Sequence, residues 1–305
     1  MSAGPDSAVY GRPPPELADP PEGAVQLSPL IPGSEALEAI APGTLSDLAV
    51  LAPPGTVERR FTLALALRAL AADGALTVLA PKEKGGSRLA RELAGFGCAV
   101  EETAKRHHRV CRTRRPARPD GLDAALAEGA PRRLDDLGLW SQPGVFSWNR
   151  IDPGTALLLE NLPALAGRGA DLGCGIGVLA KAVLAAPKVT ALALVDIDRR
   201  AVEAARRNVE DPRASFAWAD LREAGAVPER LDFVVMNPPF HDGGAEDRAL
   251  GQGFVRRAAA SLRPGGTLWL TANAHLPYEA VLDESFRQVT PRASERGYKV
   301  FEAKK

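Results

Sequence analysis

Cysteine is scarce in this sequence of 305 residues, and its scarcity excludes two kinds of protein. The three cysteines are Cys98, Cys111 and Cys174, and no two of them have the short spacing of a zinc-binding pair. An odd, low number also argues against a disulfide framework and favours a reducing compartment. We therefore expect a cytoplasmic protein without structural disulfides and without a bound metal.

The sequence also lacks an excess of either charge and any long apolar run. Lys plus Arg number 38, as do Asp plus Glu, so any contact with nucleic acid must come from a local basic patch. No apolar run reaches the length of a membrane span, and the N-terminal residues MSAGPDSAVYGRPPP lack the features of a signal peptide. We expect a soluble globular protein, and the length favours two domains.

Strand-like and helix-like segments alternate through the second half of the chain. One helix, expected at 199–209, places Val202, Ala205 and Val209 on one face. Such alternation predicts an α/β fold with right-handed crossovers and a parallel sheet, to which a hairpin at 286–305 would add an antiparallel edge. The expected strands are 169–172, 189–198, 214–220, 231–236 and 267–273, and a second helix is expected at 253–263.

The first half resembles a degenerate copy of the second. DLAVLAPPG at 47–55 matches DFVVMNPPF at 232–240, so that Ala52 stands where Asn237 would be. Two further matches follow the same order along the chain, and although two α/β halves share such patterns by chance, their order favours a duplication. We expect a non-catalytic domain at 1–118, a linker at 119–142 and a catalytic domain at 143–305.

The motif DLGCGIG places three glycines after a strand, and acids end the neighbouring strands. Asp171 precedes the glycines, and Asp196 and Asp220 end the next two strands. A pyrophosphate has no use for Asp171, whereas an ammonium group has. Asp196 can accept from both ribose hydroxyls, and Asp220 from the exocyclic amine of adenine. The set therefore asks for a ligand with an amine, a ribose and an adenine but no phosphate, and S-adenosylmethionine fits it. The expected cofactor-binding residues are Asp171, Gly173, Gly175, Gly177, Asp196, Ile197, Asp220, Leu221 and Asn237.

These motifs, with NPPFHDG at 237–243, resemble the class I S-adenosylmethionine-dependent methyltransferases, which have a Rossmann-like fold. More closely, the chain is similar to the small-domain guanine-N2 methyltransferases of ribosomal RNA, the RsmC/RlmG-like group. PGVFSWNRIDPGTALLLENL at 143–162, TANAHLPYEAVLDESF at 271–286 and GYKVFEA at 297–303 add to the resemblance. It covers 143–305 well and the first half loosely, although a degenerate N-terminal copy is also a feature of that group.

The resemblance gives the tetrapeptide NPPF at 237–240 a chemical role. An exocyclic amine is a weak nucleophile because its lone pair is delocalised into the ring. The Asn237 side-chain oxygen and the Pro238 carbonyl can accept its two hydrogens and stabilise the positive charge that grows on nitrogen. Phe240 can stack on the base, which contributes roughly 1–3 kcal/mol. We therefore expect Asn237, Pro238 and Phe240 to be catalytic, with no strong general base.

A basic run, KRHHRVCRTRRPAR at 105–118, lies at the end of the first half. An enzyme that takes up structured RNA needs phosphate contacts, although such a run is equally a solvated face. The expected substrate-binding residues are Phe240, His241, Arg109, Arg112, Arg114 and Arg115.

The resemblance implies an enzyme that methylates the exocyclic N2 amine of a guanosine in ribosomal RNA of the small subunit. It implies S-adenosyl-L-methionine as the cofactor, and we expect a monomer. Adenine-N6 and glutamine-N5 methyltransferases share the tetrapeptide, usually ending in Tyr, so a different amine stays open as the target. A non-catalytic RNA-binding assembly factor on the same scaffold is a further alternative, but the intact acids and Asn237 favour an enzyme.

Overall fold

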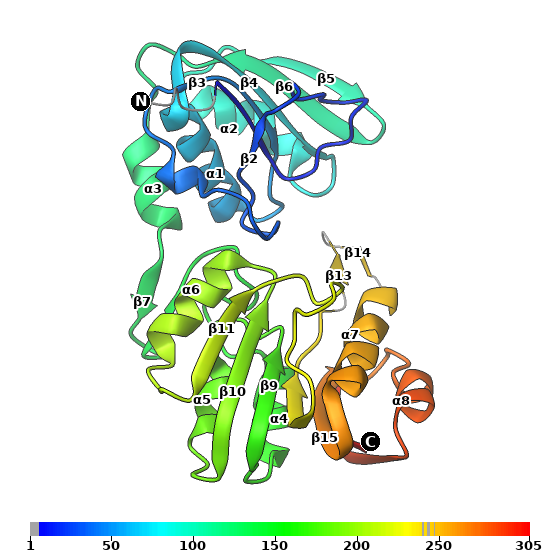
Figure 1. Cartoon of the computed structure of the whole chain (residues 1–305). Coiled ribbons are helices and arrows are strands. Elements are labelled where there is room, and N and C mark those ends of the chain that lie inside the picture. The colour runs from blue at the N-terminus through cyan, green and yellow to red at the C-terminus, as the bar shows by residue number, and fades with distance from the viewer. Residues whose placement is uncertain (1–5, 240, 243–244, 247) are drawn as a thin grey trace. The chain divides into compact units, whose positions relative to one another are not determined.

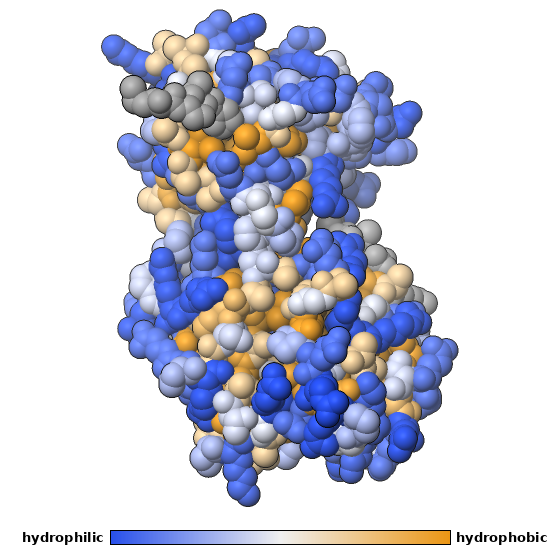
Figure 2. All heavy atoms as spheres, viewed as in Figure 1, coloured by the Kyte–Doolittle hydropathy of each residue, from blue (hydrophilic) through white to orange (hydrophobic). Residues whose placement is uncertain are grey.

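The computed structural model describes residues 6–239, 241–242, 245–246 and 248–305. The chain forms two compact units, Met1–Ala130 and Pro131–Lys305, called here the N-terminal and the C-terminal unit (Figure 1). Figure 2 shows hydrophilic side chains over most of the face in view, with apolar residues gathered in limited areas between them. Among the described residues, no helix is long and apolar enough to cross a membrane.

The C-terminal unit is built on a seven-stranded sheet of order β11-β10-β9-β12-β15-β17-β16. The first five strands run parallel, and β17 pairs antiparallel with both β15 and β16. This confirms the predicted parallel sheet with a terminal antiparallel hairpin. The strands are β9 (Gly167–Leu172), β10 (Val189–Asp196), β11 (Ala214–Trp218), β12 (Leu231–Met236), β15 (Leu262–Asn273), β16 (Gln288–Glu295) and β17 (Tyr298–Lys304).

Helices cover both faces of this sheet (Figure 1), and the alternation of strand residues explains why. In β12, Val234 and Met236 belong to one apolar cluster, whereas Phe233 and Val235 belong to another, because successive side chains point to opposite faces. Gly169 of β9 leaves room for the Phe233 ring, since a Cβ there would be 2.1 Å from that ring. The helices are α4 (Pro153–Asn161), α5 (Val178–Leu184), α6 (Arg199–Asn208), α7 (Arg248–Ser261) and α8 (Glu279–Ser285).

Two of these helices begin at aspartate caps. The Asp198 side chain accepts from the backbone N–H of Arg200 at the start of α6. Asp152 accepts from the backbone N–H groups of Gly154 and Thr155 at the start of α4, where Pro153 occupies the first helical position. Each cap satisfies backbone donors that a helix leaves unpaired at its first turn, so the sequence fixes where α4 and α6 begin.

The N-terminal unit repeats the sheet of the C-terminal unit with one strand fewer. Its order is β2-β1-β3-β4-β6-β5, which corresponds position by position to β10-β9-β12-β15-β17-β16, including the antiparallel hairpin. A strand equivalent to β11 is absent from the described sheet. The strands are β1 (Ser7–Tyr10), β2 (Val25–Gln26), β3 (Leu45–Leu51), β4 (Leu70–Pro81), β5 (Glu101–Lys105) and β6 (His108–Arg114). The helices are α1 (Thr56–Ala69), α2 (Leu89–Gly95) and α3 (Leu122–Gly129), with 3-10 turns at Leu37–Ala39 and Gly86–Arg88.

The strand register corrects the sequence match between the two units by one residue. Tyr10 pairs with Val50 across β1 and β3, as Leu172 pairs with Met236 across β9 and β12. Val50 therefore corresponds to Met236, and the position of Asn237 falls on Leu51 rather than on Ala52. The two prolines make the sequence match misleading, because β3 runs one residue further before its prolines than β12 does.

The structure also differs from the predicted linker at 119–142. The units divide between Ala130 and Pro131, and structured segments lie on both sides of that point. Helix α3 packs on α1, where Gly129 leaves room for Phe61, whose Cβ would be 2.3 Å from a Cβ at Gly129. After it, β7 (Arg132–Leu134) and β8 (Leu139–Ser141) pair as a hairpin in the C-terminal unit. The prolines and glycines of this segment mark turns between these elements.

Candidate active site

The glycine turn lies between β9 and α5 and closes on the end of β10. The backbone N–H of Gly173 donates to the carbonyl of Val195 over 2.8 Å. Gly177 caps α5 with a φ of 87°, and a Cβ there would lie 2.9 Å from the Val209 side chain. Gly175, with a φ of 52°, has open space at its Cβ position. The turn therefore requires glycine for its conformation, and Gly175 leaves room for a ligand to approach the backbone.

Asp171 is the most unusual residue of this region. It is fully buried at the end of β9, and neither carboxylate oxygen has a hydrogen-bond partner among the described residues. Burial and the neighbouring carboxylate of Asp196 raise the pKa of Asp171 to about 8, against an opposing interaction with the backbone N–H of Ala180. An unpaired buried carboxyl is costly, so this position suits a protein that binds a cationic group there.

Asp196 ends β10, the strand beside β9, and its carboxylate is held by the backbone. It accepts from the N–H of Gly175 over 2.8 Å and from the N–H of Asp198 over 2.9 Å. Burial nevertheless raises the pKa of Asp196 to about 6. These two carboxylates fit S-adenosylmethionine: Asp171 would face its ammonium group and Asp196 its ribose hydroxyls. That ligand would supply an activated methyl group at this edge.

The remaining predicted cofactor residues lie near the same edge of the sheet. The carbonyl of Ile197 accepts from the indole N–H of Trp218 over 2.8 Å. Asp220 follows β11 and pairs with Arg222, with 2.6 Å between Oδ2 and Nη2. Leu221 is buried in the core cluster that includes Met236. Asp220 must therefore share its carboxylate with Arg222 if it is to accept from adenine.

Asn237 follows β12, on the other side of β9, and its side chain is fixed by residues that sequence reasoning does not identify. Its Nδ2 donates to Asp152 Oδ1 and to Thr155 Oγ1, each over 2.9 Å. Pro238, which follows, is buried. The stretch RIDPGT at 150–155 contributes to the family resemblance, but nothing in its pattern indicates that Asp152 reaches Asn237.

The predicted aromatic and histidine contacts are less well placed. Phe240 lies outside the described residues, and His241 is described only by its backbone, at the start of the short strand β13 (His241–Asp242), which pairs with β14 (Ala245–Glu246). Upstream of Asp152, Phe146 is 61% exposed, so it is free to contact a ligand. Trp148 instead lies under the guanidinium of Arg132, 5.2 Å from the ring centre.

The four arginines predicted to grip RNA do not form one patch. Arg112 and Arg114 are exposed and lie on one face of β6, whereas Arg109 lies on the other face, because strand residues alternate. Arg109 faces Glu102 at 3.4 Å, and Arg115 follows the strand and donates to the carbonyl of Leu67 over 2.8 Å. The structure thus keeps only Arg112 and Arg114 together, with Arg114 also contacting Asp73.

In the N-terminal unit, the side chain of a buried arginine occupies the edge of the sheet that follows β3. The fully buried Arg59 donates from Nη1 to the carbonyl of Pro54 over 2.7 Å and forms an ion pair with Glu92, with 2.7 Å between Nε and Oε2. Gly85 makes room for this guanidinium, since a Cβ there would be 2.2 Å from Nη1. Arg59 thus uses a backbone carbonyl that follows β3, in a copy that also lacks the acids and the amide.

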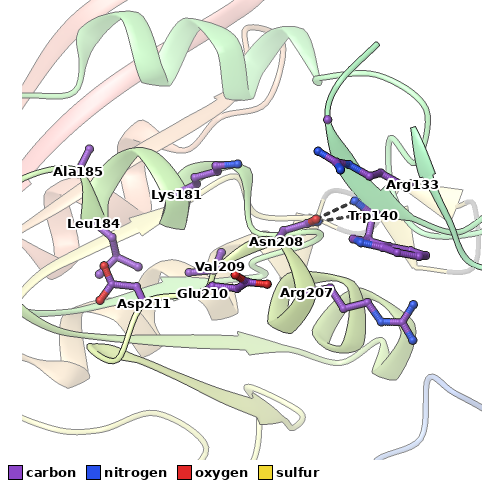
Figure 3. A pocket seen from close by; sticks show the side chains of 11 residues that line it. Arg133, Trp140, Lys181, Leu184, Ala185, Arg207, Asn208, Val209, Glu210 and Asp211 are labelled. Atoms are coloured by element: carbon purple, nitrogen blue, oxygen red, sulfur yellow. Dashed lines mark hydrogen bonds between the residues drawn. The ribbon is translucent and has the colours of Figure 1, made fainter. Parts of the chain in front are cut away.

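A separate pocket of about 560 Å³ lies between β8 and the helices α5 and α6 (Figure 3). Asn208 joins its two sides, with its Nδ2 donating to the carbonyl of Trp140 over 2.8 Å, and the Arg207 guanidinium lies 4.7 Å from the centre of the Trp140 ring. None of the predicted site residues lines this pocket. The candidate active site is therefore the edge of the sheet and not this hollow.

The sheet order, the glycine turn and the carboxylates and amide at the ends of β9, β10 and β12 together define a class I methyltransferase. The family model described as "Methyltransferase small domain" matches residues 136–302. The chain is 32% identical over 284 residues to ribosomal RNA small subunit methyltransferase C of Pseudomonas aeruginosa, which covers 92% of this chain and 86% of that protein. The protein of the same name from Chromohalobacter salexigens is 37% identical over 253 residues, which cover 79% of this chain and 73% of that one.

A solved structure resembles the whole chain. It is described as the T. thermophilus 16S rRNA N2 G1207 methyltransferase (RsmC) in complex with AdoMet and guanosine. The TM-score is 0.78 at 28% identity, over 98% of this chain and 88% of that one. The chain therefore belongs to the ribosomal RNA small subunit methyltransferase C family, within the methyltransferases that have the small domain.

Proposed function

We propose that this protein transfers a methyl group from S-adenosylmethionine to the exocyclic N2 amine of a guanosine in 16S ribosomal RNA. The observation that supports the proposal is that a cofactor-binding group and a substrate-binding group lie at the ends of two adjacent strands, β9 and β12. Asp171 offers an unpaired buried carboxylate for an ammonium group, and Asn237, across β9 from Asp196, offers an amide held from behind. The name of the T. thermophilus relative supports the choice of guanine N2.

The chain's own groups make a weak nucleophile reactive. Asn237 Oδ1 and the Pro238 carbonyl oxygen each accept one hydrogen of the target amine, which turns the nitrogen lone pair towards the methyl donor. The same two oxygens stabilise the positive charge that develops on nitrogen as the bond to the methyl carbon forms. Positioning of nitrogen against methyl supplies much of the remaining acceleration.

Proton removal follows from the product's own acidity. The methylated amine is cationic and loses one hydrogen as a proton to water, so that the neutral N2-methylguanosine remains. No residue near Asn237 needs to act as a strong base. Cys174 in the glycine turn is no candidate nucleophile either, because burial raises its pKa well above the usual range.

The experiment that tests the function identifies the modified nucleoside. Ribosomal RNA and small subunits from a strain that lacks the gene are incubated with the protein and isotopically labelled S-adenosylmethionine, then digested and analysed by mass spectrometry. We expect label in N2-methylguanosine at one position of 16S RNA. Label in N6-methyladenosine or in protein glutamine would assign a different amine, and RNA binding without product would assign an assembly factor.

We further propose that the protein works in the cytoplasm as a monomer that meets ribosomal RNA or the small subunit. Three free cysteines, two in the N-terminal unit and one in the glycine turn, agree with a reducing compartment. Sedimentation equilibrium of the protein, alone and with RNA, measures its molecular mass. A dimer would give twice the mass expected for a monomer.

A further inference from the structure

The amide of Asn237 is held through both of its hydrogens. Nδ2 carries two donors and no acceptor capacity, and both donors are used, one on Asp152 Oδ1 and one on Thr155 Oγ1, each over 2.9 Å. Among the described residues no donor is assigned to Asn237 Oδ1. The Asn237 side chain thus points its nitrogen at the start of α4, and its oxygen is available to accept on the opposite side.

Of these two partners, the carboxylate decides which way the amide lies. A hydroxyl such as that of Thr155 can donate or accept, so it would tolerate either orientation of the amide. An ionised carboxylate accepts only, so a flipped amide would set its oxygen against Asp152 Oδ1. Charge-assisted hydrogen bonds are also about twice as strong as neutral ones, so Asp152 strongly favours the orientation seen.

Asp152 itself is rigidly placed. The same Oδ1 atom caps α4 by accepting from the backbone N–H groups of Gly154 (2.9 Å) and Thr155 (3.0 Å). Behind it, Tyr298 packs on Gly154, where a Cβ would be 2.5 Å from the ring. Burial, and then the charge of Asp152, raise the pKa of Tyr298, so the Tyr298 hydroxyl remains protonated beside that carboxylate.

We propose that Asp152, assisted by Thr155, is a positioning residue that fixes the Asn237 amide with its oxygen towards the target amine. This inference rests on the proposed function. It joins three stretches that are far apart in the sequence: the start of α4, the residues after β12 and the start of β17. Asp152 acts through Asn237 and stabilises the transition state only by holding that acceptor in place.

The test separates positioning from support of the helix. Asp152→Ser keeps a good N-cap but is too short to reach Asn237. Thr155→Val keeps the shape and removes the second acceptor. Asp152→Asn keeps an acceptor oxygen and serves as the conservative rescue. Glu160→Gln is the matched control. It also removes a carboxylate from helix α4, but that carboxylate pairs with Arg296 and not with Asn237.

The expected result is a loss of kcat with little change in binding. We expect Asp152→Ser to lower kcat by roughly 10–100-fold, by analogy with the loss of outer partners that orient metal-binding side chains. Affinity for S-adenosylmethionine and KM for RNA should change by less than about threefold, and the thermal transition should stay near that of wild type. Asp152→Asn should recover most of kcat, and Glu160→Gln should match wild type.

A double-mutant cycle with Asn237→Ala decides whether Asp152 acts through Asn237. Under single-turnover conditions, Asp152→Ser should lower the rate in the wild-type background and leave the residual rate of Asn237→Ala unchanged. Equal losses in both backgrounds, or a loss confined to KM, would overturn the inference. Because wild-type protein must form N2-methylguanosine in the same assay, a failure of the proposed function would be seen separately.

Discussion

Because the buried carboxyl of Asp171 has no partner, we expect this residue to lower the stability of the ligand-free protein while it serves to bind the cofactor. Its pKa is about 8 in the folded protein, against an ordinary value of 3.8. The folded protein therefore keeps a proton that the unfolded chain has released. The free energy of unfolding of the ligand-free protein should fall as pH rises from about 4 to about 8. Each pH unit above the ordinary pKa lowers the free energy of unfolding by about 1.4 kcal/mol, so the loss at pH 7 is about 4 kcal/mol.

Asp171→Asn removes the titrating group and tests this directly. The amide is itself buried without a partner, which costs about 1–3 kcal/mol, so we expect a net gain in stability of roughly 1–3 kcal/mol at pH 7. Urea unfolding followed by tryptophan fluorescence isolates the right unit, because Trp140, Trp148, Trp218 and Trp269 all lie in the C-terminal unit. The gain should shrink as pH falls and become a loss of about 1–3 kcal/mol near pH 4, where the unpaired amide still costs stability and the proton-linked cost of wild type is almost gone.

Cofactor binding supplies the second half of this test. An ammonium group beside Asp171 lowers the pKa of the carboxyl, so binding at pH 7 should release close to one proton. Calorimetry in buffers of different ionisation enthalpy measures that release, which Asp171→Asn should abolish along with most of the affinity. A variant that is less stable than wild type at pH 7, or wild-type binding without proton release, would refute the reasoning.

Three further predictions concern the other parts of the chain. Arg59→Ala leaves Glu92 buried without its partner, so it should destabilise the N-terminal unit by about 3–5 kcal/mol, measured by labelling of its buried thiols. Neutralising Arg112 and Arg114 together should weaken RNA binding. The slope of log K against log salt concentration should become shallower by roughly 0.7–0.9 for each phosphate contact that is lost. An unchanged slope would mean that these two arginines face solvent and do not contact RNA. Calorimetry should find one cofactor site per chain, and none in Gly175→Pro, because proline cannot adopt the φ of 52° found there.

The sequence predicts the C-terminal unit well because periodicity and punctuation agree along it. The apolar run before Asn237 is β12, the acid-ended run at 189–198 contains β10, and α6 begins at Arg199, where a helix is expected. Each of these signals is local, and local preferences match the final fold. The order of motifs along the chain is enough to place the acids and the amide at one edge of the sheet.

The features that sequence reasoning does not find depend on interactions between distant segments. The bond from Asn237 to Asp152 spans 85 residues, and in the sequence Asp152 looks like an ordinary helix cap. The pairing of Arg59 with Glu92 spans 33 residues, and an arginine within a helical pattern is normally expected on the exposed face. The basic run suggests one patch because the strand alternation that separates Arg109 from Arg112 becomes visible only with β6 in place.

Asn237 is expected to accept a hydrogen bond from the target amine, and the methylation rate of its alanine variant tests this role. Formation of N2-methylguanosine in 16S RNA is followed under single-turnover conditions for wild type and Asn237→Ala, with cofactor affinity measured for both. We expect the rate to fall by about 10²–10³ in Asn237→Ala, as when one oriented group that stabilises developing charge is removed, at nearly unchanged affinity for S-adenosylmethionine. Near-normal turnover by Asn237→Ala would contradict it.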